Sequence, residues 1–314
     1  MTPPASPNPS ISVITPCLNG ARYIGEAIDS VVSQGCADAE HIVADGGSTD
    51  GTLDILASHP HLKFQSAPDQ GMYDALNGAL ARARGGVIGI LNCDDCYAED
   101  VFLPILDLFR DDGVMAVAGR AATFRVDTAP AGDALTAAPA AAGGDAIFRS
   151  TLGDPSINAW FFRASVFERI GRFDAAYRIA GDREFMLRFA LSGLRYVDTD
   201  RLICRYRAHA GSATFGGNEE IWHAILREHG RMTGHYLASA VVPGPARDLI
   251  KRARIRDTLS GALYSVSRHD LRQVLWYAAA GTRYDPVWPA RFARRAFGVL
   301  ARKIGLRDER GRVS

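Results

Sequence analysis

Residues 71–91, GMYDALNGALARARGGVIGIL, contain the two patterns that decide the fold. Apolar side chains recur there at the spacing of a helix with one buried face, which predicts a helix over Gly71–Arg84. Gly85 and Gly86 end this helix, and Val87–Leu91 is a continuous apolar run typical of a fully buried strand. The stretch therefore predicts a helix that leads directly into the interior of a sheet.

The same alternation precedes this stretch. Short strands are predicted at 11–14, 41–44 and 62–66, and amphipathic helices at 24–33 and 52–58. Strands that alternate with helices of this length favour right-handed crossovers and a mostly parallel sheet covered on both faces. The first half of the chain is therefore predicted to have an α/β fold.

The second half alternates less regularly. It is predicted to contain strands at 114–119, 121–126, 195–197 and 202–206, and helices at 165–170 and 182–191. The residues beyond 217 show only helical patterns, at 219–233, 246–263, 271–280 and 291–304. An Ala-, Pro- and Gly-rich segment at 127–146 predicts a flexible surface loop.

The composition is that of a folded protein, with 47% hydrophobic and 23% charged residues, which excludes a disordered or collagen-like chain. The formal net charge is +1, so the chain as a whole is not expected to bind nucleic acid. The charge is unevenly distributed, because residues 240–314 contain 16 Lys and Arg against 6 Asp and Glu. A mildly acidic body is therefore followed by a basic C-terminal region.

Three features of the sequence indicate the cellular compartment of the protein. No window reaches the roughly 20 apolar residues that span a membrane, and the first ten residues lack the pattern of a secretory signal. The 5 cysteines are an odd number and widely spread, which argues against a disulfide framework and favours a reducing compartment. We therefore expect a cytoplasmic protein.

Carboxylates follow three of the predicted strands. Asp45 follows the second strand, Asp69 the third, and Asp94 and Asp95 the fourth. Because the loops at the carboxyl ends of parallel strands gather at one edge of the sheet, these side chains are expected to converge where ligands bind. They would repel a bare anion, so they indicate hydrogen bonds to hydroxyl groups or a hard divalent cation that holds phosphate oxygens.

The loop after the first strand, TPCLNG at 15–20, lacks the Gly-rich phosphate-binding patterns. This disfavours both a P-loop nucleotidase and a nicotinamide-binding domain. Purely structural roles are the alternatives for these aspartates, since Asp94 and Asp95 suit a helix-capping turn and Asp45 suits a Gly-rich turn. Cys93 and Cys96 have the spacing of a zinc or redox half-site, but no second Cys or His pair accompanies them.

Four ordered blocks of this sequence resemble family 2 glycosyltransferases: Ser12–Asn19, Asp45–Thr52, Pro68–Asn77 and Leu91–Asp95. Members of this family are inverting, metal-dependent enzymes of the GT-A fold that use nucleotide sugars. The resemblance covers about residues 10–210. It implies a mostly parallel mixed sheet flanked by helices, to which this chain adds a helical C-terminal region.

The resemblance implies a nucleotide-sugar-binding role for one set of residues: Thr15, Pro16, Asn19, Asp45, Asp69, Asn77 and Asp94. Within this set, Asp45 matches the acid that pairs with the base, and Asp94 lies toward the ribose. Many members have a second acid where this chain has Gly46, so one polar contact is missing or replaced.

The resemblance also implies the metal and the catalytic base. Asp95 matches the ligand of the Mg²⁺ or Mn²⁺ that bridges the diphosphate, and Asp182 matches the catalytic base. A helix cap is the alternative for Asp182. His209 is either near the diphosphate or simply in a surface loop. Asn158 follows Ile157 where relatives commonly have a His-Gln pair, which leaves the acceptor contacts open.

These inferences predict an inverting glycosyltransferase. The expected donor is a UDP-, GDP- or dTDP-sugar, and the expected acceptor is a hydroxyl of a glycan or lipid-linked precursor of a cell-surface polysaccharide. One alternative is a sugar-phosphate nucleotidyltransferase, which would need a basic Gly-rich loop after the first strand. The other is a non-catalytic protein that binds nucleotide sugars.

The expected organisation is a disordered lead at 1–9, a glycosyltransferase domain at 10–215 and a helical, basic region at 216–314. In the last region, residues 291–304 interleave basic and apolar side chains. This pattern is that of an amphipathic helix in peripheral contact with the anionic inner face of a membrane. A solvated basic helix face is the alternative.

Overall fold

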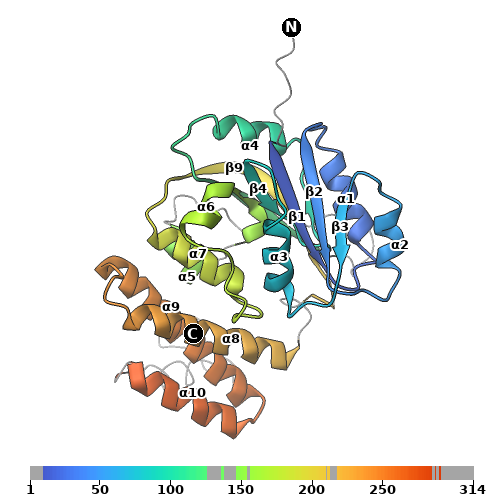
Figure 1. Cartoon of the computed structure of the whole chain (residues 1–314). Helices are drawn as coiled ribbons and strands as arrows, with labels where there is room; N and C mark the ends of the chain where they lie inside the picture. The colour runs from blue at the N-terminus through green and yellow to red at the C-terminus, as the bar shows by residue number, and fades with distance from the viewer. Residues whose placement is uncertain are drawn as a thin grey trace, which may run out of the picture. The chain divides into compact units, whose positions relative to one another are not determined.

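The structure is a computed structural model that describes residues 10–125, 136–137, 146–153, 156–209, 211–212, 218–284, 287 and 290. The chain divides into two compact units, 1–218 and 219–314 (Figure 1). The predicted disordered lead, most of the predicted loop at 127–146 and the predicted helix at 291–304 lie outside the described residues.

The first unit is built on one mixed sheet, whose strands in spatial order are β3-β2-β1-β4-β8-β6-β9-β5, with β7 paired to β6. Their bounds are β1 Ile11–Cys17, β2 Ala39–Asp45, β3 Lys63–Ser66, β4 Val87–Ile90, β5 Cys96–Tyr97, β6 Ala116–Arg125, β7 Thr136–Ala137, β8 Trp160–Arg163 and β9 Tyr196–Ala208. Strands β1 to β4 are parallel, β8 is antiparallel to both of its neighbours, and β6 is parallel to β9.

Helices cover both faces of this sheet (Figure 1). Their bounds are α1 Ile24–Val32, α2 Thr52–Ala57, α3 Met72–Leu80, α4 Phe102–Leu108, α5 Ala146–Thr151, α6 Ala164–Arg169 and α7 Gly181–Leu191, with a 3-10 turn at Ile157–Ala159. One apolar core joins α1, α2 and α4 to the sheet, and another joins α3, α6 and α7. The predicted α/β fold with a mixed sheet between helices is confirmed.

The later strands differ from the prediction. The segments 114–119 and 121–126 belong to the single strand β6, and 195–197 and 202–206 to the single strand β9. The register between β6 and β9 shifts around Arg120, because an irregularity interrupts the pairing there. This interruption lies where the sequence pattern breaks, so each long strand was predicted as two short ones.

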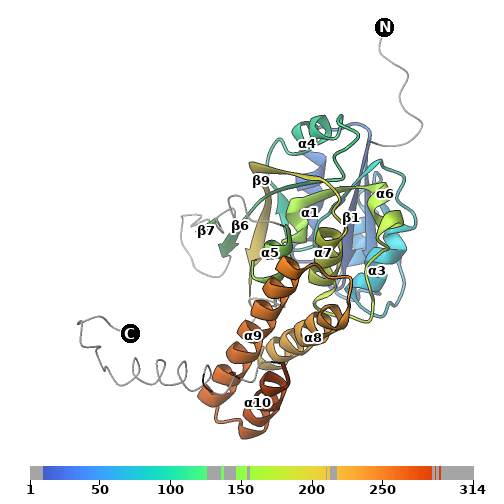
Figure 2. The ribbon, with the colours of Figure 1, turned by 90° about the vertical axis from the view of Figure 1, so that its left-hand side faces the viewer.

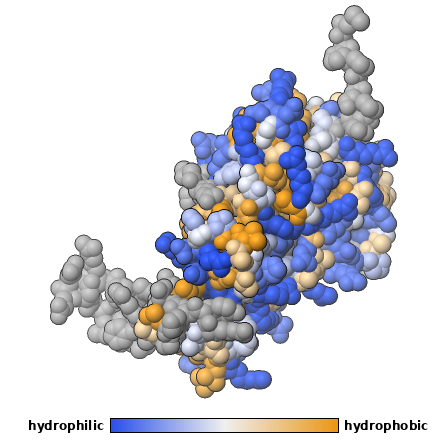
Figure 3. Space-filling model, turned by 60° about the vertical axis from the view of Figure 1, so that its left-hand side comes forward, coloured by the Kyte–Doolittle hydropathy of each residue, from blue (hydrophilic) through white to orange (hydrophobic). Residues whose placement is uncertain are grey.

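Strand β8 was not predicted as a strand. Its aromatic residues Trp160, Phe161 and Phe162 are buried at 1%, 0% and 0% exposure. The strand lies between β4 and β6 and turns a parallel sheet into a mixed one. Figure 3 shows a mostly hydrophilic surface with apolar patches on the face that it displays.

The second unit is helical in the part that the structure describes. Its helices are α8 Glu219–Ala238, α9 Gly244–Ser267 and α10 Leu271–Tyr284, each longer than the predicted segment (Figure 2). A small core of Leu226, Leu259, Ala262 and Tyr277 joins them. Among the described residues, no helix has both the length and the apolar character needed to cross a membrane.

Candidate active site

The carboxyl ends of the parallel strands meet at one edge of the sheet in the first unit. Cys17, the last residue of β1, is in register with Asp45 of β2, and Asp45 is in register with Ser66 of β3. On the other side of β1, the Leu91 N–H after β4 donates to the Ile14 carbonyl at 3.0 Å. The loops that carry the predicted carboxylates therefore all begin at this edge.

Asp45 shapes the turn that follows β2. Its side chain accepts hydrogen bonds from the N–H groups of Gly47 and Ser48 at 3.0 and 2.9 Å, from the Ser66 hydroxyl at 2.6 Å, and from the Ser48 hydroxyl. Burial alone would raise the pKa of Asp45, but the hydrogen bonds outweigh it and the pKa is lowered. Asp45 is thus held as an anion at this edge.

Asp69 lies against the backbone at Gly46. A Cβ added to Gly46 would stand 2.7 Å from Asp69 Oδ2, which is too close for a carbon and an oxygen. Asp69 Oδ1 also accepts a hydrogen bond from the Gly71 N–H at 2.8 Å. The carboxylate of Asp69 therefore occupies the space next to residue 46, where relatives have a second acid.

Thr15 and Pro16 are buried in β1. Thr15 Oγ1 lies 2.8 Å from Nε2 of His41 on β2, and Thr15 is 0% exposed. Burial lowers the pKa of His41 to about 3, so this imidazole is neutral. The side chain of Thr15 thus joins two strands, and its predicted contact with a nucleotide stays a prediction.

The two predicted asparagines connect segments of the chain. The Asn19 N–H donates to the Ser48 hydroxyl at 2.7 Å, and Asn19 Oδ1 accepts from the Thr49 N–H at 2.9 Å, which ties the loops after β1 and β2 together. Asn77 on α3 binds the backbone of Phe173. Asn19 therefore belongs to the edge, whereas the side-chain hydrogen bonds of Asn77 hold another segment.

Asp95 is fully buried and accepts hydrogen bonds from uncharged groups. The Arg207 backbone N–H donates to Oδ1 at 2.8 Å, and the Asn158 and Asn92 side chains donate to Oδ2 at 2.6 and 3.4 Å. Burial and the neighbouring charge of Asp94 raise the pKa of Asp95 to about 8. No ion pair involves Asp95 in the described ranges. Such a carboxylate is stabilised by a nearby cation.

Asp94 is the more accessible of the pair and lies next to His209. Asp94 Oδ2 is 3.0 Å from His209 Nε2, and their side chains are 29% and 13% exposed. The Gly211 N–H donates to His209 Nδ1 at 3.1 Å, so the ring proton is on Nε2, and the His209 ring donates this hydrogen bond to Asp94. A larger cluster of three or more His, Cys, Asp or Glu ligands is absent from the described part of the chain. A cation here would take further ligands from phosphate and water, as Mg²⁺ commonly does.

Arg207 is a residue that the sequence did not single out. Its Nε donates to the Asp94 carbonyl at 2.8 Å, and its Nη2 pairs with Glu26 of α1 at 2.7 Å. Its guanidinium lies 4.5 Å from the centre of the Tyr23 ring, which is a cation–π contact. Arg207 thus holds the Asp94–Asp95 loop to β9 and α1. The sequence offered one indication that Arg207 belongs to the site: it lies at the end of a predicted strand, two residues before His209.

Asp182 lies in the first turn of α7. The Arg183 N–H donates to Asp182 Oδ1 at 2.7 Å, and the hydroxyl of Tyr73 on α3 donates to the same oxygen at 3.1 Å. Arg183 also donates to the Ser150 and Thr151 carbonyls at the end of α5. These contacts fix the predicted base between α3 and α5.

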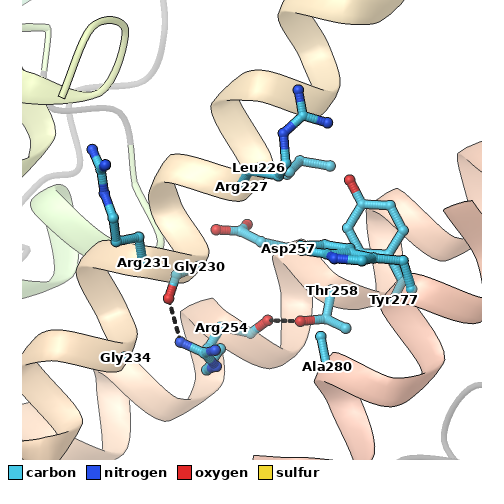
Figure 4. Close-up of a pocket in the computed structure, with 11 residues that line it drawn as sticks. Leu226, Arg227, Gly230, Arg231, Gly234, Arg254, Asp257, Thr258, Tyr277 and Ala280 are labelled. Atoms are coloured by element: carbon cyan, nitrogen blue, oxygen red, sulfur yellow. Dashed lines mark hydrogen bonds between the residues drawn. The ribbon is translucent and has the colours of Figure 1, made fainter. Parts of the chain in front are cut away.

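The second unit contains a cavity of about 390 Å³ between α8, α9 and α10 (Figure 4). Its charged groups already serve to join helices, since Arg254 donates to the Gly230 carbonyl and Asp257 lies 3.1 Å from His229. In Figure 4 the guanidinium groups of Arg227 and Arg231 extend away from Asp257. None of the predicted site residues lines this cavity, so the candidate site is the sheet edge of the first unit.

Comparisons with known proteins show the family of the chain. Residues 12–171 match the model of the family described as glycosyl transferase family 2. A PGL/p-HBAD biosynthesis glycosyltransferase of Mycobacterium bovis is 31% identical over 195 residues, which are 57% of this chain and 69% of that protein. A chondroitin synthase of Escherichia coli is 38% identical over 108 residues, which are 33% of this chain but only 16% of the synthase.

Solved structures share the fold at low sequence identity. S. aureus TarS 1-349 in complex with UDP-GlcNAc has a TM-score of 0.63 and 17% identity, over 90% of this chain and 82% of that one. The mannosyltransferase PcManGT from Pyrobaculum calidifontis, in complex with GDP-Man and Mn²⁺, has a TM-score of 0.54 and 20% identity, over 96% and 88%. The fold expected from the resemblance is confirmed. Together with the family match over half of the sequence, these findings show that the chain belongs to glycosyl transferase family 2.

Proposed function

We propose that this chain transfers a sugar, with inversion, from a nucleotide-diphosphate donor to a hydroxyl of a glycan or lipid-linked acceptor. The observation that carries the proposal is the accessible Asp94–His209 pair beside buried Asp95, at the edge where Asp45 also lies. The TarS structure contains UDP-GlcNAc and the PcManGT structure contains GDP-Man and Mn²⁺, which supports a donor of this class and a divalent cation.

Asp94 is the residue that would hold the cation. The resemblance assigns the ion to Asp95, but Asp95 is 1% exposed and its oxygens already accept hydrogen bonds. The greater exposure of Asp94 favours it as the ligand, with His209 hydrogen-bonded beside it and Asp95 as the support beneath it. When bound, the cation would neutralise the charge that develops on the departing diphosphate.

The chain's own residues perform the remaining tasks. The turn organised by Asp45 binds the nucleoside, and Asp182 accepts the proton of the attacking acceptor hydroxyl. The new bond to the anomeric carbon forms on the face opposite to the departing diphosphate, which inverts the configuration. A carboxylate is a weak base toward a sugar hydroxyl, so proton transfer occurs late, once the forming bond has made that hydroxyl acidic.

The biological setting follows from the same proposal. Two of its relatives are a chondroitin synthase and a glycosyltransferase of PGL/p-HBAD biosynthesis, which supports a role in making a cell-surface glycan. We place the enzyme in the cytoplasm, with its basic C-terminal region in peripheral contact with the membrane. The excess of basic residues in 240–314 supports this contact.

A thermal-unfolding screen of nucleoside diphosphates with and without Mn²⁺ tests the donor class. One nucleotide is expected to raise Tm only when the cation is present, because a ligand at 100 times its Kd stabilises by about 2.7 kcal/mol. Mn²⁺-dependent release of sugar from the matching donor is then expected. Unchanged release by Asp94→Ala, or in excess chelator, would contradict the proposal.

The same assays separate the alternatives. A sugar-phosphate nucleotidyltransferase would release pyrophosphate from a nucleoside triphosphate and a sugar phosphate. A non-catalytic binding protein would show the Tm increase without any turnover.

A further inference from the structure

The start of α7 is held by a side chain from α3. Tyr73 is 2% exposed, and its hydroxyl lies 2.9 Å from the Ile179 carbonyl and 3.1 Å from Asp182 Oδ1. These two acceptors flank the residues that lead into α7. The hydroxyl therefore shares its single proton between the approach to the helix and the carboxylate that we propose as the base, in a three-centre hydrogen bond.

The ring of Tyr73 packs directly on this helix start. A Cβ added to Gly181 would come within 2.7 Å of the ring, so only glycine allows the observed approach. On its other side the ring lies 5.6 Å, centre to centre, from the ring of Phe173. The position of the Tyr73 hydroxyl is thus set by packing rather than by its hydrogen bonds alone.

A second side chain of α3 holds the other end of the same segment. Asn77 is four residues after Tyr73, so the two lie on one face of the helix. Its Nδ2 donates to the Phe173 carbonyl at 2.8 Å, and its Oδ1 accepts from the Phe173 N–H at 3.0 Å. Side chains of α3 therefore form hydrogen bonds with both ends of the segment 173–182, which leads to Asp182.

The same helix begins at the donor side of the site. Asp69, which lies against Gly46, is three residues before the start of α3 and four residues before Tyr73. The helix α3 thus links Asp69, on the proposed nucleotide side, to the segment that carries the proposed base Asp182. The side-chain torsion of an aspartate carboxyl group is broad, so a hydrogen bond is what fixes its orientation.

We propose that Tyr73 is a positioning residue that orients the carboxylate of Asp182 toward the acceptor hydroxyl. The inference rests on the proposed function, in which Asp182 is the base. Its consequence is that loss of the Tyr73 hydroxyl slows the chemical step and leaves donor binding intact, because small errors in the placement of a catalytic group are costly.

Tyr73→Phe tests this, since it removes the hydroxyl and keeps the ring that packs on Gly181. We expect kcat to fall about tenfold with an unchanged KM for the donor. Tyr97→Phe is the matched control, because Tyr97 is 4% exposed and its hydroxyl donates to the Ile90 carbonyl at 3.2 Å rather than to a carboxylate. That variant is expected to keep the kcat of the wild type.

A double-mutant cycle shows whether Tyr73 acts through Asp182. In an Asp182→Asn background, Tyr73→Phe is expected to cause no further loss of kcat. An equal loss in both backgrounds, or a wild-type kcat for Tyr73→Phe beside an impaired Asp182→Asn, would overturn the positioning role alone. A wild-type kcat for Asp182→Asn would instead overturn the assignment of the base, and the inference with it.

Discussion

Asp95 of the first unit and Asp257 of the second are both buried, but the partners of their carboxyl groups differ. In the first unit, Asp95 is 1% exposed, lies beside Asp94 and accepts hydrogen bonds from uncharged groups. In the second unit, Asp257 is 8% exposed and pairs with His229 at 3.1 Å and with Arg256 at 2.8 Å. The first arrangement disfavours the charged form of the buried carboxyl group, and the second stabilises that form within the protein.

The pKa values reflect this difference. Burial and the charge of Asp94 together raise the pKa of Asp95 to about 8. Burial acts in the same direction on Asp257, but the hydrogen bond and charge of His229 and the charge of Arg256 outweigh it. The pKa of Asp257 is therefore lowered. A carboxyl group with so strongly raised a pKa is common at functional sites, so its place at this edge of the sheet points to a ligand. Paired charge points to a structural role.

The largest effect is expected for Asp94→Ala in the first unit. Loss of this carboxylate removes a proposed cation ligand, and we expect kcat/KM for sugar transfer to fall about 100- to 1,000-fold. The unfolding midpoint without ligand should hardly change, because Asp94 is partly exposed. Steady-state kinetics with Mn²⁺ and denaturant unfolding provide the two measurements. A large loss of stability with retained turnover would mean that Asp94 stabilises the fold and does not hold a catalytic cation.

A smaller loss of activity is expected for Gly181→Ala. The new Cβ would stand 2.7 Å from the Tyr73 ring, so the start of α7 and Asp182 must shift. We expect kcat to fall about tenfold to 100-fold, since a displaced base loses its alignment. Gly78→Ala on α3 is the matched control, because nothing lies within 4 Å of its new Cβ. It is expected to keep kcat and to stabilise the helix by about 0.5–1 kcal/mol.

The second unit should respond in the opposite way. Asp257→Asn breaks a buried ion pair, and we expect a loss of about 1.5–3 kcal/mol in the free energy of unfolding. Turnover per folded molecule is expected to stay at the wild-type value. Asp248→Asn, at an exposed position on α9, is the control and should change neither quantity. An Asp257→Asn enzyme that is stable but inactive would undo the contrast between the units.

The sequence predicted the first half of the fold because the signals there are local. Buried parallel strands are continuous apolar runs, and the helices between them are amphipathic, so β1–β4 and α1–α3 were all located. Strand β8 was missed because its place between β4 and β6 depends on antiparallel pairing over a long sequence separation. No local periodicity reports such pairing.

The position of the carboxylates at one edge of the sheet was predictable for the same reason. Strand ends place carboxylates at a common edge, so Asp45, Asp69 and Asp94 were located from topology alone. The supporting residues come from distant segments. Arg207 and Asn158 meet Asp95 across 112 and 63 residues, and nothing in the sequence near Asp95 specifies them. The sequence also does not indicate that Asp95 is buried whereas Asp94 is partly exposed.

The smallest effect concerns Asp45, a buried carboxylate of the first unit that the protein itself satisfies. Its pKa is lowered in the folded state by four hydrogen bonds that outweigh burial, and an unfolded aspartate has a pKa of about 3.9. Asp45 therefore stabilises the fold above pH 4, and this contribution is lost as the pH falls through the lowered value. Denaturation from pH 3 to 6 should show a gap between wild type and Asp45→Asn that narrows toward low pH. A gap of constant size would mean that shape rather than charge makes Asp45 stabilising, which would remove it from the comparison with Asp257.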